Sequence, residues 1–225
     1  MSDVASALAR HGAPPDALER LARYGELLLE RNREFNLTGA RDADAIADHI
    51  ADALTLLPLI AEDGELIDIG AGGGLPGIPL AIVRGIRVTS VDATAKKIAF
   101  ISDAMKQLGI GGEAIAARAE NLARDQRFRE RFTYATGRAL ASAAAVVELT
   151  LPFVAIGGSA LLQRGTLSDA ERKALKASAL VLGSEVTAEL PLAGERRILV
   201  VTKRTPTPER FPRRVGIAQH RPLSS

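Results

Sequence analysis

The chain has 225 residues, of which 47% are hydrophobic and 25% charged, and its formal net charge is +2. This length suits one sizeable α/β domain with a small addition, and the composition excludes bulk disorder. The sequence contains no cysteine, which excludes a disulfide framework, a thiolate zinc site and a catalytic thiol. No apolar run reaches the roughly 20 residues that a membrane span needs. We therefore expect a cytoplasmic monomer that needs neither a membrane nor a metal.

The positive charge is concentrated near the C-terminal end. Residues 203–225 carry a net +5, which leaves −3 for residues 1–202. Four prolines favour an extended backbone in this stretch. Composition alone favours a disordered, solubilising tail, and an arm that binds nucleic-acid phosphates is the alternative. The candidate phosphate contacts in this stretch are Lys203, Arg204, Arg210, Arg213, Arg214 and Arg221. Loss of the tail is then expected to weaken RNA binding and to leave cofactor affinity nearly unchanged.

The first sixty residues show the spacing of amphipathic helices. After a Pro-Pro turn, Asp16 is expected to cap a helix whose apolar residues recur every three or four positions. Asp42 is expected to cap a second helix that ends near Pro58. Because no strand pattern occurs here, residues 1–62 are predicted to form a small helical subdomain.

From residue 65, short apolar runs alternate with helical segments. The expected strands are 66–69, 87–91, 114–117, 133–136 and 159–163, and the expected helices are 77–83, 95–108, 142–155 and 169–179. This alternation predicts an α/β fold whose sheet is mostly parallel and covered on both faces. Two further runs, 181–187 and 197–202, predict a C-terminal antiparallel hairpin. Residues 63–203 are thus expected to form one ligand-binding domain, followed by a basic tail at 204–225.

A glycine-rich loop, 70–74, follows the first expected strand. Glycine permits positive φ and close approach of a ligand, and amides at the start of the next helix favour an anionic or polar group. Asp68 stands two positions before Gly70, as in the acidic-x-Gly-x-Gly-x-Gly pattern of Rossmann-like methyltransferases. Asp92 ends the second expected strand, where a carboxylate can hold two ribose hydroxyls.

Two cofactor classes remain compatible with this loop. Gly72, Gly74 and Gly77 also match the dinucleotide fingerprint, and a carboxylate at Asp92 serves either cofactor. The position of Asp68 and the C-terminal hairpin favour S-adenosylmethionine. A methyltransferase is therefore the favoured interpretation. The alternatives are a nicotinamide-dependent oxidoreductase and a non-catalytic, RNA-binding ribosome assembly factor.

The continuation of the loop is more specific than its glycines. Residues 68–82, with Leu75-Pro76-Gly77-Ile78-Pro79 at their centre, resemble the ribosomal RNA small subunit methyltransferase G family. Other motifs resemble the same family along almost the whole chain: Asn32-x-x-x-Asn36-Leu37-Thr38, His49-Ile50-x-Asp52-Ala53, Val91-Asp92-Ala93-Thr94-x-Lys96-Lys97, Arg118-Ala119-Glu120, Arg138-Ala139, Phe211-Pro212-Arg213-Arg214-x-Gly216-Ile217 and Arg221-Pro222-Leu223. The chain departs from the family's usual residues at Arg31, Thr133 and Gln163, and Arg164 keeps a positive charge where lysine is usual.

The resemblance implies a Rossmann-like class I methyltransferase that moves a methyl group from S-adenosylmethionine to guanine N7 in the 530 loop of 16S ribosomal RNA. Together with the loop pattern, it implies cofactor contacts at Gly70, Gly72, Leu75, Asp92, Ala93, Thr94, Ala119, Glu120 and Arg138. Arg138 is expected to align donor and acceptor, with a purely structural ion pair as the alternative. Arg164 joins the candidate RNA contacts.

Guanine N7 carries an in-plane lone pair and no proton, so this chemistry needs alignment more than a general base. His49 and Asp52 lie one helical turn apart and suggest either a catalytic dyad or a structural hydrogen bond; we favour the second. For the arginine-rich stretch 124–131 the alternatives are contact with phosphates and a solvated face; interleaved acidic residues favour the second.

Overall fold

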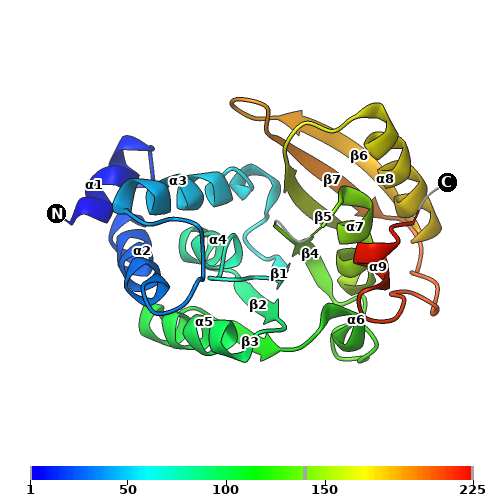
Figure 1. Cartoon of the computed structure of the whole chain (residues 1–225), viewed down its shortest axis with the longest axis horizontal. Coiled ribbons are helices and arrows are strands. Elements are labelled where there is room, and N and C mark those ends of the chain that lie inside the picture. Colours follow the sequence, from blue (N-terminus) through cyan, green and yellow to red (C-terminus); the bar gives the residue numbers. More distant parts are fainter. Residues whose placement is uncertain (1, 139–140, 224–225) are drawn as a thin grey trace. The chain divides into compact units, whose positions relative to one another are not determined.

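The computed structural model describes residues 2–138 and 141–223. Its fold is mixed α/β, with seven strands in the sheet order β3-β2-β1-β4-β5-β7-β6 (Figure 1). The chain forms two compact units: Met1–Gly64 with Ala71–Ala116, and Glu65–Gly70 with Ala117–Ser225. These units are defined by contacts within the chain. They differ from the segments 1–62, 63–203 and 204–225, which the sequence suggests as a helical subdomain, a ligand-binding domain and a basic tail.

The first unit begins with three helices, α1 (Asp3–Arg10), α2 (Leu18–Asn32) and α3 (Ala43–Leu54), and the 3-10 turn η1 (Leu57–Leu59). Asp42 caps α3 as predicted, since its side chain accepts a hydrogen bond from Ala45 N at 2.9 Å. The predicted cap at Asp16 is wrong, because α2 follows Ala17 and has no side-chain cap. The sequence pattern also missed α1, a helix of only eight residues whose buried side chains are Val4, Ala5, Ala7 and Leu8.

The rest of this unit is a pair of strands with two helices. It contains α4 (Gly77–Arg84), β2 (Arg87–Asp92), α5 (Ala95–Leu108) and β3 (Gly112–Ala116), and the two strands run parallel. Arg20 on α2 joins these helices: its guanidinium donates to the carbonyls of Ile82 at 3.2 Å and Leu108 at 2.8 Å. Gly25 lets α2 pack closely, since a Cβ there would lie 2.7 Å from Val4 Cγ1.

In the second unit, β1 (Glu65–Ile69), β4 (Phe132–Thr136) and β5 (Val154–Arg164) run parallel. The last two strands, β6 (Ser184–Pro191) and β7 (Arg197–Lys203), form the predicted antiparallel hairpin, and β7 pairs with β5. Helix α8 (Asp169–Val181) packs against β6 (Figure 1). Because α8 extends to Val181, β6 begins three residues after the predicted start.

The helix predicted over 142–155 is shorter in the structure. It divides into α7 (Ala143–Thr150) and the 3-10 turn η2 (Leu151–Phe153), after which β5 begins. Pro152 explains the break, because proline has no N–H for the helical ladder. The short helices α6 (Ala119–Leu122) and α9 (Ile217–His220) complete the unit. Within residues 2–138 and 141–223, no helix has the length and apolarity to cross a membrane.

Glu189 on β6 joins the hairpin to α8. Its carboxylate accepts hydrogen bonds from Arg172 at 3.0 Å and from Arg197, and these bonds lower its pKa to about 2. Because the folded pKa lies below the unfolded value of about 4.3, the stabilisation is complete above that value and is lost as the pH falls towards 2. Solvent screening limits it to about 1 kcal/mol. We expect Glu189→Gln to lower the free energy of unfolding by this amount at pH 7 in urea titrations, and by progressively less between pH 5 and pH 3.

Candidate functional site

The glycine-rich loop adopts a backbone that side chains would strain. Gly70, Gly72 and Gly74 have φ of +69°, +58° and +93°. Within the first unit, Gly74 N donates to the Ala71 carbonyl at 2.7 Å, and Ala71 N donates to the Val91 carbonyl at 3.0 Å. The second of these bonds holds the loop at the carboxyl end of β2. Left-handed φ values are the reason for glycine here.

Helix α2 supports the loop from behind. The hydroxyl of Tyr24 is buried and donates to the Gly73 carbonyl at 2.8 Å. A Cβ on Gly73 would lie 2.7 Å from Leu28 Cδ1, so this glycine is needed for close packing. Sequence reasoning missed Tyr24, although its place beside Leu21 and Leu28 on the buried face of α2 was a signal.

Asp92 is held in a fixed orientation beside the loop. One carboxylate oxygen accepts from Gly72 N at 3.1 Å and the other from Thr94 N at 2.8 Å, while Lys97 Nζ lies 3.8 Å away. Each oxygen keeps a lone pair for a further donor, as two ribose hydroxyls require. The structure therefore brings together three of the predicted cofactor contacts, and Leu75 and Ala93 adjoin them in sequence.

The asparagine motif organises the segment after α2. Asn32 is buried; its side-chain oxygen accepts from Leu37 N at 2.8 Å and Thr38 N at 3.0 Å, and its amide donates to the Ala40 carbonyl. At the departure from the family pattern, Arg31 pairs with Glu34 at 2.8 Å. These bonds assign the motif a structural role.

In the second unit, β1 and β4 end side by side. Asp68 pairs with Thr136 in parallel register, so Gly70 and Arg138 each leave the sheet two residues later at the same edge. The strand order reverses between β1 and β4, and ligands of open α/β sheets bind at such a reversal. Ala139, the next residue of the Arg138 motif, lies outside the described residues.

Glu120 on α6 contacts the C-terminal segment. The residue is 6% exposed, and its carboxylate accepts a hydrogen bond from Gly216 N at 2.8 Å. Ala119 begins the same helix. The structure thus places a predicted cofactor residue against the Arg-Arg-x-Gly motif of the tail, a connection across 96 residues that sequence reasoning did not anticipate.

The predicted phosphate contact at Lys203 is wrong. Lys203 ends β7 with its side chain fully buried, where Nζ pairs with Glu130 Oε1 at 2.9 Å and donates to the Leu151 carbonyl at 3.0 Å. Burial lowers the pKa of Lys203, against the opposing effect of Glu130. Burial raises the pKa of Glu130, but the bonds from Thr207 N and Lys203 outweigh it and leave that pKa lowered.

The tail is packed, so the disordered interpretation is also wrong for residues 204–223. Arg213 donates to the fully buried carboxylate of Glu148 through its backbone N at 2.9 Å and its guanidinium at 2.6 Å. Arg124 donates to the Pro212 carbonyl at 2.6 Å, and Arg129 to the Phe211 carbonyl at 3.0 Å. These two arginines therefore bind the tail, whereas the sequence predicted a solvated face.

Exposed cations remain on this unit. The side chains of Arg204, Arg210, Arg214 and Arg221 lie at the surface and stay candidates for phosphate contacts. Arg164 is half-buried and donates to the Ala141 carbonyl, and burial lowers its pKa. Among the residues that the structure describes, no group of three or more possible metal ligands occurs.

Comparison with known proteins identifies the family to which this chain belongs. The family model described as rRNA small subunit methyltransferase G matches residues 17–200. The chain belongs to the rRNA small subunit methyltransferase G family. Members of that name include a protein of Pelotomaculum thermopropionicum, 38% identical over 216 residues, which cover 92% of this chain and 90% of the relative. Another, from Synechococcus elongatus, is 40% identical over 207 residues, covering 87% and 86%.

Solved structures support the fold of this methyltransferase G family member. The mitomycin 7-O-methyltransferase MmcR matches with a TM-score of 0.59 and 14% identity, covering 90% of this chain and 74% of its own. A ribosomal protein L11 methylase from Lactobacillus delbrueckii subsp. bulgaricus matches with a TM-score of 0.56 and 12% identity, covering 75% and 81%. A mutant of MtNAS in complex with S-adenosylmethionine matches with a TM-score of 0.54 and 18% identity, covering 80% and 73%. At these identities the likeness concerns the fold alone.

Proposed function

We propose that this protein uses S-adenosylmethionine to methylate N7 of a guanine in the 530 loop of 16S ribosomal RNA, acting as a cytoplasmic monomer on the RNA or the small ribosomal subunit. Family membership over residues 17–200 carries the proposal, and it favours a methyltransferase over a nicotinamide-dependent oxidoreductase.

The loop and Asp92 fit the proposed cofactor. Asp92 presents a carboxylate whose orientation is fixed by two backbone amides, which suits a pair of ribose hydroxyls. The positive φ of Gly72 and Gly74 removes side chains where a ligand must approach the backbone. We propose the other cofactor contacts at Gly70, Leu75, Ala93, Thr94, Ala119, Glu120 and Arg138.

When bound, S-adenosylmethionine supplies a methyl group already activated on a sulfonium. Guanine N7 carries a lone pair and no proton, so transfer would need no base. The protein's task would be to align N7 with the methyl carbon, opposite the carbon–sulfur bond that breaks as the new bond forms. N7 lies on the major-groove edge, which is inaccessible in A-form RNA, and the target guanine must therefore lie in a loop or be splayed out. We assign the alignment to Arg138.

The function is tested by incubating the protein with labelled S-adenosylmethionine and unmethylated small subunits, then mapping the modified nucleotide. Label at N7 of a guanine in the 530 loop supports the proposal. Binding of NAD in preference to S-adenosylmethionine would indicate an oxidoreductase. RNA binding without transfer would indicate a non-catalytic assembly factor.

The mechanism predicts different effects for Arg138 and His49. Arg138→Ala should lower the single-turnover rate by about 100-fold, because misalignment of reacting atoms has effects of this size. His49→Ala should lower stability or RNA affinity and spare that rate at saturating substrates, since no general base is needed.

A pH profile of the single-turnover rate separates the two roles. Between pH 6 and pH 9 we expect the wild-type profile to be flat. An acidic limb in the wild type that disappears in His49→Ala would make His49 the base and contradict the alignment mechanism.

A further inference from the structure

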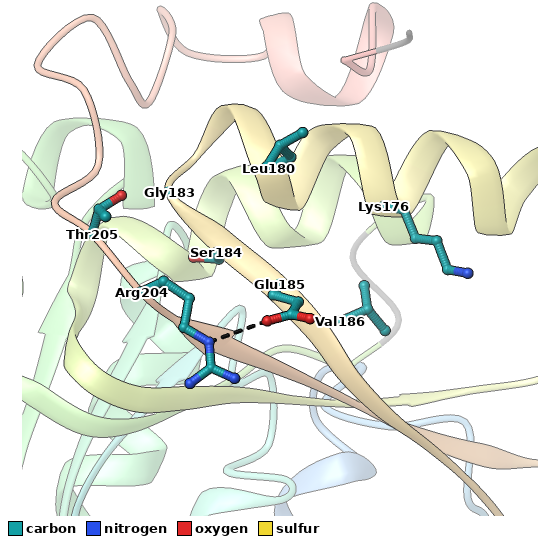
Figure 2. Close-up of a pocket in the computed structure, with 8 residues that line it drawn as sticks. All are labelled: Lys176, Leu180, Gly183, Ser184, Glu185, Val186, Arg204 and Thr205. Carbon is teal, nitrogen blue, oxygen red and sulfur yellow. Dashed lines mark hydrogen bonds and ion pairs between the residues drawn. The ribbon is translucent and has the colours of Figure 1, made fainter.

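A hollow of about 600 Å³ lies beside the end of α8 in the second unit. Figure 2 shows that three segments line it: α8 above, the start of β6 in the middle, and the chain after β7 on the other side. Its lining carries two cations, one carboxylate, two hydroxyls and two apolar side chains: Lys176, Arg204, Glu185, Ser184, Thr205, Leu180 and Val186. Its volume is in the range of ligand pockets, which is roughly 300–1,000 Å³.

Ser184 gives this hollow an unused hydrogen-bonding group. The residue is 3% exposed, and its hydroxyl oxygen has no hydrogen-bond partner among the described residues. Buried polar groups in proteins normally have a partner. The oxygen is covered by its neighbours, so a ligand in the hollow would supply the missing bond once the side chains over Ser184 move aside.

Two cations border the same hollow. Lys176 is exposed on α8, and Arg204 pairs with Glu185 through Nε at 3.2 Å, with both side chains more than half exposed. Such a surface pair is weak and can exchange partners. In Figure 2 the two terminal nitrogens of Arg204 point away from Glu185. They are therefore open to a second anion, and a phosphate is the anion that a guanidinium fork fits best.

The remaining lining is apolar. Leu180 is 77% exposed on α8, and Val186 is half-buried on β6. Together with the hydroxyls of Ser184 and Thr205, these side chains offer a surface for the flat face of a base and donors for its edge. Proteins bind single-stranded nucleic acid by combining cations along its backbone with side chains against which a base packs, which are usually aromatic. In this hollow the aliphatic side chains of Leu180 and Val186 provide the packing surface.

We infer that this hollow binds one unstacked nucleotide of the RNA substrate, with the phosphate on one side of the nucleotide on Arg204 and the next phosphate along the strand on Lys176, its base against Leu180 and an edge group on Ser184. The inference rests on the proposed function, because it names where that RNA is held. β6 is separated from β4, and so from Arg138, by β5 and β7 in the sheet order. The hollow is therefore a second RNA contact, away from the predicted methyl-transfer site.

The first test uses the full chain and a naked, unmethylated 16S rRNA fragment in filter-binding titrations at several salt concentrations. The double variant Lys176→Ala/Arg204→Ala should bind about 10-fold more weakly. The slope of log affinity against log salt should flatten by about 1.4, as expected for two lost contacts to a single strand. The matched control is Arg33→Ala/Lys106→Ala, which removes two exposed cations of the first unit and should keep the wild-type slope.

Ser184→Ala provides a second test. Because the hydroxyl has no partner among the described residues, its removal should leave thermal stability unchanged while RNA affinity falls several-fold. A variant that keeps both stability and RNA affinity would contradict the role of Ser184.

The outcomes separate this inference from the proposed function. Wild-type affinity and salt slope in Lys176→Ala/Arg204→Ala, with methylation intact in the wild type, would overturn the inference alone. Weakened binding to assembled small subunits but not to naked RNA would also overturn it, and would indicate a protein partner. If the wild type does not methylate RNA, the proposed function fails, while RNA binding that depends on these two cations would still support the hollow as an RNA site.

Discussion

Gly72→Asp is expected to abolish binding of S-adenosylmethionine in a protein that still folds. The Gly72 amide donates to Asp92, so an aspartate side chain at this position brings a second carboxylate close to the Asp92 carboxylate. Like charges at this separation repel, and the new side chain fills space that the ligand must enter. It also opposes the carboxylate of the cofactor itself. Calorimetric titration should show affinity at least about 100-fold weaker than the wild type, equivalent to 2.7 kcal/mol or more.

Gly12→Asp is the matched control for this loss. Gly12 also has a positive φ, +72°, and a Cβ there would meet no atom within 4 Å. Both substitutions place an aspartate in the left-handed region, so the backbone strain is similar. Equal loss of cofactor affinity in both variants would indicate strain as the cause. Unchanged affinity in a folded Gly72→Asp protein would show that the loop is not the cofactor site.

The parts of the fold that were predictable depend on local patterns. Alternating apolar runs and helical segments were enough to locate all seven strands and the antiparallel hairpin, because the periodicity of apolar residues is a local property of the sequence. Errors occurred at boundaries where neighbours compete. At Val181 the helical ladder of α8 continues through a residue with strand propensity. Helix α7 ends at Thr150, two residues before Pro152, although the apolar composition that follows predicted a longer helix.

The candidate site likewise contains residues that local patterns predict and contacts that they do not. Gly72, Asp92 and Thr94 were predictable, because they lie at the ends of adjacent local elements. The contact of Tyr24 with Gly73 spans 49 residues, and that of Glu120 with Gly216 spans 96. No local spacing encodes such contacts.

The tail shows most clearly what charge counting misses. Its net +5 suggested free cations, yet Lys203 is neutralised by Glu130 and Arg213 by Glu148. These acidic partners lie 73 and 65 residues earlier in the chain, within segments that have charge patterns of their own. The candidate RNA contacts in the tail are therefore its exposed arginines, and the net charge of the tail overstates how many cations are available.

Arg213→Ala is expected to lower the free energy of unfolding by about 3–5 kcal/mol, because it leaves the fully buried Glu148 carboxylate without its counter-charge. The hydrogen bonds between the two side chains raise the pKa of Arg213, as expected for a stabilising pair. Arg214→Ala, which removes the exposed neighbouring arginine, should change stability by no more than about 0.5 kcal/mol. Urea denaturation of both variants measures the difference.

A double-mutant cycle identifies the source of this loss. Glu148→Leu removes the buried charge, so Arg213→Ala introduced into that variant should be much less harmful than in the wild type. Additive losses would show that Arg213 stabilises the tail by packing and not through Glu148.

Arg213→Ala also tests whether the tail supports the predicted cofactor site. The sequence alone predicts that losing the tail leaves cofactor affinity nearly unchanged. However, Arg213 anchors the segment whose Gly216 amide holds Glu120, and loss of that anchor frees a carboxyl group proposed to contact the cofactor. We therefore expect weaker binding of S-adenosylmethionine in Arg213→Ala and wild-type binding in Arg214→Ala. If Arg213→Ala instead keeps its stability and cofactor affinity and flattens only the salt dependence of RNA binding, Arg213 is a phosphate contact, as its place in a basic tail first suggested.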